Sequence, residues 1–410
     1  MNILLINHYA GSPHHGMEFR PYYLAREWVK VGHSVRIVAG SYSHIRAKQP
    51  ADFAAPKLQQ QIDGIDYVWY RTPSYQGNGL GRVRSIVSFI AQLWRDARSI
   101  AASFQPDVVI ASSTYPMDIW PAHRIATLAG AKLVYEVHDL WPLSPIELGG
   151  MSPWHPFIMW VQWAEDYAYR QSDLVVSMLP KTLEYMVSRG LESKKWTYVP
   201  NGVDFQEWSA RAALPQDIEA ALKAVKARGL PLLCYAGTHG LANALDVLLD
   251  AAALLKGQFE VVLVGTGPER DRLLQRVHDE QLANVTMLPS VPKASVPELL
   301  DAIDIAYIGW HPNPLYRFGI SPNKLMDYMM AGKPILHSVA AGNDPVKEVG
   351  CGITVPPNQP AAVASAALSL SAMSPQEKQT MGQRGKAFIC SQRSYEILAA
   401  QFLQNIALDA

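Results

Sequence analysis

The sequence predicts an α/β protein made of two doubly wound domains. Its 410 residues are too many for one ordinary core and suit two domains of about 200 residues each. Short apolar runs alternate with helical stretches along most of the chain, which is typical of parallel sheets with crossover helices. The alternation begins a second time near residue 231, so we expect two successive modules and not one large sheet.

The first half contains the strands and helices of one module. Residues 2–6 form an apolar run, residues 8–16 a loop of small residues, residues 19–32 a helical pattern and residues 34–40 the next strand. This order predicts a unit with parallel strands and a right-handed crossover. Further strands are expected at residues 67–71, 107–113, 132–138 and 173–178.

The second half repeats the pattern. A buried strand is expected at residues 231–237 and its helix at 244–255. More strands are expected at residues 259–265, 284–289, 304–309 and 333–339. The boundary is expected after residue 204, which gives domains of residues 1–204 and 205–383. Residues 384–410 predict a closing helix that packs back on the N-terminal domain.

Composition excludes several classes of protein. Lysine plus arginine equals aspartate plus glutamate at 36 each, which argues against a nucleic-acid partner. The three cysteines are far apart, so we expect buried thiols and neither disulfides nor a zinc site. The first apolar run has no basic region before it and predicts a core strand, and no run is long enough to span a bilayer. We therefore expect a cytoplasmic protein, with peripheral contact to the inner face of the membrane as a further possibility.

A helix start follows a glycine-containing loop in the second half. Ser321 is a good N-cap, Pro322 fits the first helical position, and Gly332 suits the helix end. We therefore expect a helix from Pro322 to Ala331. Exposed N–H groups and the helix dipole make such a start attractive to anions.

Lys324 and Asp327 lie in the first turns of this helix. A cation near a helix N-terminus is unfavourable by itself, so Lys324 fits a helix start that binds a phosphate. Asp327 lies three residues on, on the same face, and can accept hydrogen bonds from two ribose hydroxyls. The alternative is an ordinary capped helix with a solvated lysine and aspartate.

A second pair of polar residues, His138 and Asp139, ends a predicted strand. Ligands of doubly wound folds bind at this edge of the sheet, and a histidine there can hold or transfer a proton near neutral pH. The alternative is a structural histidine–aspartate pair.

Several segments, taken in order, resemble retaining GT-B glycosyltransferases of family four, which build bacterial polysaccharides. They are the loop of residues 8–16 with MEFR, YEVHDLWP (135–142), YAGTHGLANALDVLL (235–249) and FGISPNKLMDYMMAGKPIL (318–336). The SPNK form with aspartate resembles a subgroup that includes fucosamine-type transferases of O-antigen and capsule synthesis. The resemblance implies two Rossmann-like domains facing each other across a cleft, with the acceptor side at residues 1–204 and the nucleotide-sugar donor at 205–383.

The resemblance also assigns roles to residues of the second half. Asp327 would bind the ribose, and Lys324 the phosphates. Gly319 occupies the position of the family's first glutamate. In place of the glutamate side chain, the backbone N–H groups of Gly319, Ile320 and Ser321 would contact the donor sugar. Thr238 and Asn243 replace the usual Arg–Lys clamp on the diphosphate, and N–H groups of the loop would compensate, with Gly237, Thr238 and Gly240 as the candidates.

The pattern GTGPERDRL (265–273) would lie near the base, with Gly265, Gly267 and Arg270 as candidate contacts. A solvated Arg270 is the alternative.

In the first half, the resemblance places His138 beside the donor sugar, together with Asp139. Gly11 and Gly16 of the first loop would let the backbone approach the diphosphate or the acceptor closely, and Arg20 would follow on the first helical turn. A flexible surface loop with a solvated arginine is the alternative.

The implied activity is transfer of a sugar from a UDP-linked donor with retention of configuration. The sugar would be an N-acetylated hexosamine or deoxyhexosamine, and the acceptor a glycan or a polyprenyl-diphosphate-linked glycan. No cofactor is implied, and the chain contains no Asp-x-Asp that would hold a metal ion on the diphosphate. The alternatives are a UDP-sugar 2-epimerase of the same fold and a non-enzymatic sugar-binding protein of periplasmic type. An NAD-dependent dehydrogenase is disfavoured because no full GxGxxG follows a strand.

Two stretches combine basic and aromatic residues. Arginines lie among apolar residues from Arg82 to Phe104, and Trp154 to Trp163 reads WHPFIMWVQW. Such helices can lie in a membrane interface, and a polyprenyl-diphosphate acceptor would account for both. The alternative is a core-facing amphipathic helix in each case.

Overall fold

The computed structural model of the chain divides into two compact units, each described by itself. Unit 1 comprises Met1–Asn201 and Tyr395–Ala410, and unit 2 comprises Gly202–Ser394. The structure describes residues 1–16, 19–51, 53–77 and 79–408. The expected division after residue 204 lies three residues later than the division in the structure.

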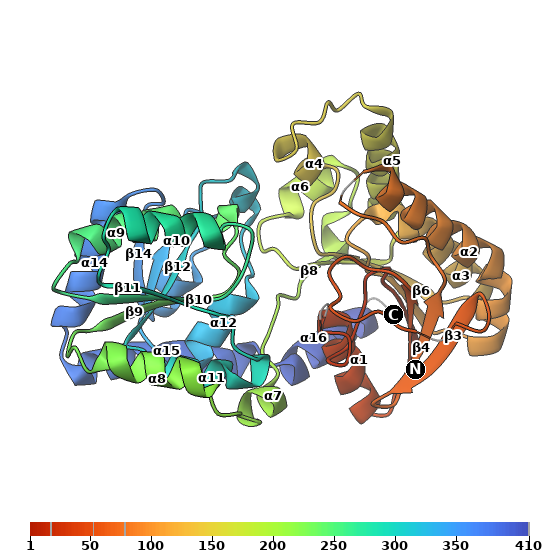
Figure 1. Ribbon diagram of the computed structural model, residues 1–410. Coiled ribbons are helices and arrows are strands. Elements are labelled where there is room, and N and C mark those ends of the chain that lie inside the picture. The colour runs from red at the N-terminus through yellow and green to blue at the C-terminus, as the bar shows by residue number, and fades with distance from the viewer. Residues whose placement is uncertain (17–18, 52, 78, 409–410) are drawn as a thin grey trace. The chain divides into compact units, whose positions relative to one another are not determined.

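Unit 1 is built on an eight-stranded sheet with the order β3-β4-β2-β1-β5-β6-β7-β8 (Figure 1). Every pair is parallel except β3 and β4, which form an antiparallel hairpin at one edge. The strands are β1 (Asn2–Ile6), β2 (Ser34–Gly40), β3 (Lys57–Ile62), β4 (Ile65–Tyr70), β5 (Val108–Ala111), β6 (Lys132–Val137), β7 (Leu174–Ser177) and β8 (Trp196–Tyr198).

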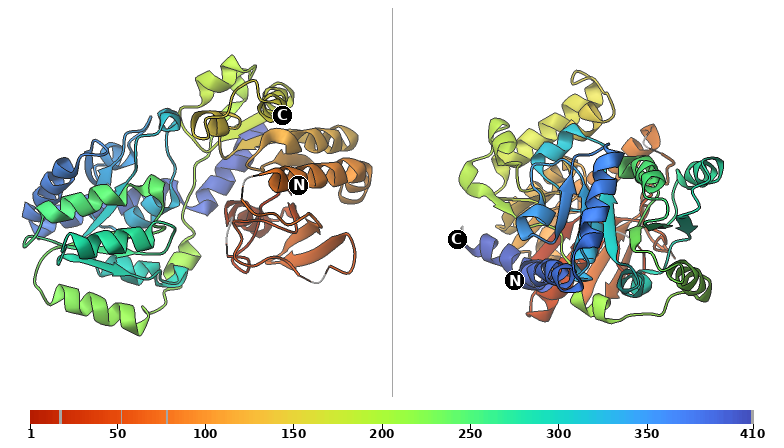
Figure 2. Two further views of the ribbon diagram at one scale, coloured as in Figure 1. Left: turned by 45° about the horizontal axis from the view of Figure 1, so that its top comes forward. Right: turned by 90° about the vertical axis from the view of Figure 1, so that its left-hand side faces the viewer.

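The helices of unit 1 cover this sheet. They are α1 (Phe19–Lys30), α2 (Leu80–Phe104), α3 (Ile119–Ala129), α4 (Leu143–Glu147), α5 (Pro156–Gln171), α6 (Leu183–Ser188) and α16 (Tyr395–Leu408). α1 and α16 pack against each other and share one apolar core with the sheet, so the last helix lies beside the first (Figure 2). α2, α3 and α5 pack as neighbours in a separate group.

Unit 2 has a six-stranded parallel sheet with the order β11-β10-β9-β12-β13-β14. Its strands are β9 (Leu232–Ala236), β10 (Glu260–Val264), β11 (Val285–Leu288), β12 (Ile305–Gly309), β13 (Ile335–Ser338) and β14 (Gly352–Val355). Two separate apolar cores line the two faces of this sheet, as a doubly wound fold requires.

Helices cover both faces of the second sheet (Figure 1). One core includes residues of α9 (Leu245–Leu254), α10 (Arg270–Asp279) and α14 (Pro360–Ala372). The other includes residues of α7 (Phe205–Ser209), α8 (Gln216–Lys226), α11 (Val296–Asp301), α12 (Asn323–Met330), α13 (Pro345–Val349) and α15 (Pro375–Gln392).

The closing segment differs from the expected single helix. α15 ends at Gln392 and α16 begins at Tyr395, so residues 384–408 belong to two helices. α15 packs on unit 2 against α12, whereas α16 packs on unit 1 against α1. The chain thus returns to unit 1 through the short break at Arg393 and Ser394. None of the described helices is long and apolar enough to cross a membrane.

Candidate functional site

The start of α12 differs in one detail from the predicted helix start. Pro322 has an extended backbone, with φ −79° and ψ 132°, and is itself the N-cap, so the helix begins at Asn323. The prediction of Ser321 as N-cap and Pro322 as the first helical residue is therefore wrong by one position. The predicted end is confirmed, because Gly332 follows the helix with φ +67°.

Lys324 points from the first turn of α12 to the carboxyl end of β9. Its Nζ donates to Tyr235 Oη at 2.6 Å, lies 4.0 Å from the centre of the Tyr235 ring, and is 3.4 Å from Asn243 Oδ1. A Cβ on Gly237 would lie 2.5 Å from Lys324 Cε, so glycine is needed for this close approach. Burial lowers the pKa of Lys324 to about 7, and among the described residues no carboxylate pairs with it.

His239 lies beside this lysine and has unusual surroundings. Its ring is fully buried, and among the described residues neither ring nitrogen has a hydrogen-bond partner. Burial, followed by the positive charges of Arg270 and Lys324, lowers its pKa to about 4. The Nε of Arg270 is also buried without a partner. Buried polar groups are normally paired, so these unpaired nitrogens set this cluster apart from an ordinary core.

The loop after β9 adds backbone donors to the same place. The N–H of Gly237 donates to Val264 O at 2.9 Å, and the N–H of His239 donates to Thr266 O at 2.8 Å. The N–H of Gly237 thus already has an internal acceptor, and the predicted place of Gly237 in a donor site stays a prediction. Within the described part of the chain, the N–H groups of Thr238 and Gly240 have no protein acceptor, so they are the free donors of this loop.

Gly265 and Gly267 act through close packing of two loops. A Cβ on Gly265 would lie 1.9 Å from Gly237 O, and a Cβ on Gly267 would lie 2.5 Å from His239 O. Their φ angles of +152° and +154° also favour glycine. Both glycines therefore position the loop that carries His239.

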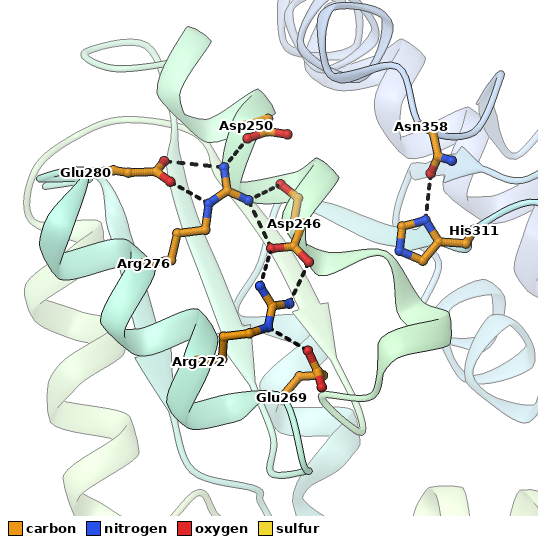
Figure 3. A network of polar contacts seen from close by, with 8 residues as sticks. All are labelled: Asp246, Asp250, Glu269, Arg272, Arg276, Glu280, His311 and Asn358. Atoms are coloured by element: carbon orange, nitrogen blue, oxygen red, sulfur yellow. Dashed lines mark hydrogen bonds and ion pairs between the residues drawn. The ribbon is translucent and has the colours of Figure 1, made fainter.

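A network of ion pairs fixes the helices behind these loops (Figure 3). Arg272 of α10 bonds both carboxylate oxygens of Asp246 on α9, at 3.0 and 2.6 Å. Arg276 contacts Asp246 as well, and pairs with Asp250 and Glu280. These two arginines pair with carboxylates, whereas Arg270 at the start of the same helix has no carboxylate partner among the described residues and its charge acts on His239.

Two of the three expected donors in the loop before α12 have internal acceptors. The N–H of Gly319 donates to Tyr316 O at 2.9 Å, and the N–H of Ile320 donates to Asn343 Oδ1 at 2.7 Å. The side-chain amide of Asn343 donates back to Ile320 O at 3.2 Å. Internal acceptors thus already use the N–H groups of Gly319 and Ile320, and their predicted contact with a donor sugar stays a prediction.

Asp327 has different neighbours from Lys324, although both residues lie on α12. Its carboxyl is mostly buried, and burial raises its pKa to about 7. The charge of Lys293 opposes this rise, and that of Glu207 adds to it; these two form an ion pair of 2.6 Å. No described residue forms a hydrogen bond with the Asp327 carboxyl, which leaves its oxygens available as acceptors.

In unit 1, His138 follows the end of β6 and belongs to a buried polar group. Its Nε2 lies 2.9 Å from Ser112 Oγ and 3.2 Å from Glu136 Oε2. Ser112 donates its single proton to Glu136 Oε2 at 2.6 Å, so His138 must carry a hydrogen on Nε2 to bond either group. In the neutral ring, Nδ1 is then the acceptor. The neighbouring Asp139 is exposed.

Arg20 is part of this group and differs from its prediction. Its Nε donates to Glu136 Oε1 at 3.0 Å, and its other nitrogens donate to the carbonyls of Pro200 at 2.5 Å and Val199 at 2.8 Å. Although burial disfavours the charge on Glu136, Arg20 and His138 hold its pKa well below the usual range. Arg20 thus has a structural role here, in contrast to the predicted contact with phosphate or acceptor.

The two glycines of the first loop are held within unit 1. Gly11 is buried, and its carbonyl accepts a hydrogen bond of 2.8 Å from Tyr67 Oη. Gly16 has φ +78°, and a Cβ there would lie 2.9 Å from Ala47 Cβ. Both therefore shape the loop, and neither contact indicates a ligand.

Sequence reasoning missed three residues that are central to this geometry. His239 and Tyr235 lie in the segment of residues 235–249, in which roles were assigned mainly to the glycines. A histidine between small residues directly after a strand was a signal that could have indicated His239. Glu136 lies in the apolar run KLVYEV, where a single acid in a buried strand signals a paired charge. Asp118 in unit 1 is a further buried acid, and burial raises its pKa to about 7.

Comparison with known proteins gives both halves of the chain a class. Residues 15–202 match the model of the glycosyl transferase 4-like domain, and residues 231–373 match that of glycosyl transferases group 1. The chain is thus a glycosyltransferase. A comparison with curated proteins found no significant match.

Solved structures with the same architecture cover nearly the whole chain. HepE of Anabaena in complex with UDP and glucose is 18% identical, with a TM-score of 0.66 over 99% of both chains. Sucrose-phosphate synthase of Thermosynechococcus elongatus is 16% identical, with a TM-score of 0.71 over 99% of this chain and 98% of the other. A glycosyltransferase of Rickettsia africae is 13% identical, with a TM-score of 0.70 and the same coverage. These likenesses show the fold, which is GT-B with two Rossmann-like domains.

Proposed function

We propose that the enzyme transfers an N-acetylated hexosamine or deoxyhexosamine from a UDP-sugar, with retention of configuration, to a glycan or polyprenyl-diphosphate-linked acceptor. The reaction would serve the synthesis of a cell-surface polysaccharide such as O-antigen or capsule, as the resemblance to fucosamine-type transferases suggests. It would take place on the cytoplasmic side of the membrane and use no metal ion. UDP is favoured because the solved complexes of Anabaena HepE contain UDP or UDP-glucose.

One observation carries the proposal. At the carboxyl edge of the sheet of unit 2, Lys324, Arg270 and His239 gather without a carboxylate partner among the described residues. The free N–H groups of Thr238 and Gly240 lie on the loop that carries His239. A diphosphate supplies the missing negative charge and enough oxygen acceptors for these donors.

Asp327 supports a nucleoside diphosphate over a simple anion. Its carboxyl lies on the same short helix as Lys324, three residues further on, and makes no hydrogen bond within the described residues. A carboxylate cannot bind the phosphates, but it accepts hydrogen bonds from the hydroxyls of a ribose. The two residues would therefore bind neighbouring parts of one nucleotide.

The mechanism follows from charge development at the leaving group. As the bond between the sugar and the diphosphate breaks, negative charge grows on the diphosphate, and preorganised cations and N–H donors stabilise it. Lys324 and Arg270 would supply this stabilisation. His138 would lie beside the donor sugar, with its Nε2 hydrogen fixed toward Ser112 and Glu136, and the acceptor hydroxyl would attack from the face that the diphosphate leaves.

A nucleotide-release screen over several nucleotide-sugars tests the proposal, with and without a lipid-diphosphate sugar acceptor. We expect release of UDP that depends on the acceptor, and a product whose anomeric configuration, read by NMR, matches the donor. Isomerisation of the donor without an acceptor would replace the proposal with a 2-epimerase. No turnover of any donor would refute it.

Binding of UDP tests the site without turnover. We expect Lys324→Ala and Asp327→Ala each to raise the dissociation constant, while Lys347→Ala, which removes an exposed lysine of the same unit, leaves it unchanged. Unchanged binding in both site variants would remove α12 from the donor site.

A further inference from the structure

A groove on the helical layer of unit 1 lies away from the groups described so far. It has a volume of about 940 Å³ and runs between α2, α3 and α5. It brings together the two basic-aromatic stretches of the sequence, Arg82 to Phe104 and Trp154 to Trp163, which are about fifty residues apart. The apolar and aromatic residues that line it include Val87, Ile90, Trp94, Trp120, Trp160 and Trp163.

Its lining is unusual for a surface exposed to water. Trp94 is 45% exposed and Trp163 is 58% exposed. Exposed indoles in a concave surface indicate an apolar ligand, because their hydration is unfavourable and a ligand would remove it.

A chain of aromatic contacts connects the groove to the end of β6. Ring centres lie 5.1 Å apart for Trp163 and Trp120, 5.9 Å for Trp120 and Trp160, 6.2 Å for Trp160 and Phe157, and 6.4 Å for Phe157 and Trp141. Trp141 is three residues after His138. All of these rings except Trp163 are partly buried against one apolar cluster, so the groove, whose lining ends at Trp160 and Trp163, is linked through aromatic packing to the neighbourhood of His138.

Arginines lie at both ends of this path, and Asp139 is an acidic group that interacts with Arg82. The guanidinium of Arg82 lies 5.5 Å from the centre of the Trp141 ring, at the end near His138. Arg95, Arg98 and Arg124 line the groove itself, and its lining contains no carboxylate. A ligand with an apolar chain and an anionic head group complements both features.

We propose that this groove binds the isoprenoid chain of the acceptor, with the diphosphate that carries the chain near Arg82. The inference rests on the proposed function, because it adds a binding site for the lipid part of that acceptor. A groove suits a single extended chain, whereas a bilayer surface is flat. The enzyme would thereby recognise its acceptor through the chain as well as through the sugar.

Binding of prenyl diphosphates tests the groove without sugar transfer, so its result is independent of whether the proposed reaction occurs. Isothermal titration calorimetry compares geranylgeranyl diphosphate with dimethylallyl diphosphate, which has the same head group on one isoprene unit. We expect the long chain to bind at least about tenfold more tightly. Equal affinities would refute the groove as a chain site.

Variants locate the effect. We expect Trp120→Ala to remove most of the preference for the long chain and to leave binding of dimethylallyl diphosphate unchanged. Trp163→Ala should also reduce the preference for the long chain, and because Trp163 is more exposed, this variant is less disruptive to folding. The matched control is Trp154→Ala, since Trp154 is 81% exposed and does not line the groove. Equal losses for short and long chains would indicate a structural role and refute the proposal.

Vesicles separate a chain site from a bilayer site. Co-sedimentation with vesicles of phosphatidylcholine and phosphatidylglycerol, without acceptor, should be the same for Trp120→Ala and the unmodified enzyme. If this variant loses vesicle binding and keeps its preference for the long prenyl chain, the groove is a membrane contact and the proposal is wrong.

Discussion

Replacing Lys324 by methionine removes a buried charge at the proposed phosphate site while keeping a side chain of similar length. Burial lowers the pKa of Lys324 from 10.5 to about 7, so at pH 8 most of the free enzyme holds it as a neutral amine. A bound diphosphate favours the charged form and raises this pKa again. Binding of UDP at pH 8 should therefore take up protons from the buffer.

The magnitude follows from the titration. With a pKa of about 7 before binding and a value near 10.5 after it, Lys324 takes up about 0.9 proton at pH 8 and only about 0.1 at pH 6. Asp327, with its pKa of about 7, is mostly ionised at pH 8 and contributes little there. His239, with its pKa of about 4, would need a rise of about four units to contribute.

Calorimetry in buffers of different ionisation enthalpy measures this uptake at pH 8. For the unmodified enzyme, a plot of the observed binding enthalpy against the ionisation enthalpy of the buffer should have a slope of about 0.9 proton per UDP bound. In Lys324→Met the slope should fall close to zero, and UDP should bind more weakly. A slope near zero in the unmodified enzyme, or the same slope in both proteins, would refute the assignment of Lys324 to the phosphates.

The same substitution should stabilise the enzyme without ligand. Between pH 7 and 10.5 the unfolded chain keeps the Lys324 proton and the folded chain loses it, so stability rises with pH in this window. Below pH 7 the buried charge destabilises the fold by at most about 5 kcal/mol. Lys324→Met should therefore raise the melting temperature at pH 6, with a smaller gain at pH 10.

Three further substitutions test other parts of the structure. Asp327→Ala should weaken the binding of UDP about tenfold or more and leave the binding of inorganic diphosphate unchanged, because only the ribose contact is lost. Competition assays measure both affinities, and equal losses for the two ligands would contradict this. Glu136→Gln leaves the charge of Arg20 buried without its partner and should lower the free energy of unfolding by about 3–5 kcal/mol in urea titrations. Gly265→Ala places a Cβ 1.9 Å from a facing carbonyl and should destabilise the protein more than Gly257→Ala, where the space is open; similar melting temperatures would argue against this packing role.

Much of the fold could be predicted because the strands are apolar runs of the right length. The order of elements and the two doubly wound sheets follow from that alternation. Strand β3 was missed because its sequence, KLQQQI, is mostly polar and exposed, as suits an antiparallel edge strand. Asp63 and Gly64, which connect it to β4 with φ values of +50° and +80°, were a hairpin signal that periodicity alone did not detect.

The candidate site was predictable where one residue type has one chemical use. Lysine in the first turn of a helix predicted an anion, and the structure adds a buried amine without a carboxylate partner. Roles of backbone N–H groups could not be predicted, because they depend on which carbonyls lie nearby. Thus Gly319 and Ile320 have internal acceptors, whereas Thr238 and Gly240 have none among the described residues.

The spacing of Lys324 and Asp327 explains how one short helix could bind two chemical groups. Lys324 reaches the carboxyl end of β9, where Gly237 leaves room for it, and Asp327 lies near Lys293 and Glu207. Burial moves the pKa of both residues to about 7 from opposite directions. Each is thus destabilised in its charged form until a ligand compensates it, the lysine by an anion and the aspartate by hydroxyl donors. Under the proposed function, adjacent parts of the same molecule would relieve the two costs, so a nucleoside diphosphate should bind more tightly than the separate affinities of ribose and diphosphate would suggest.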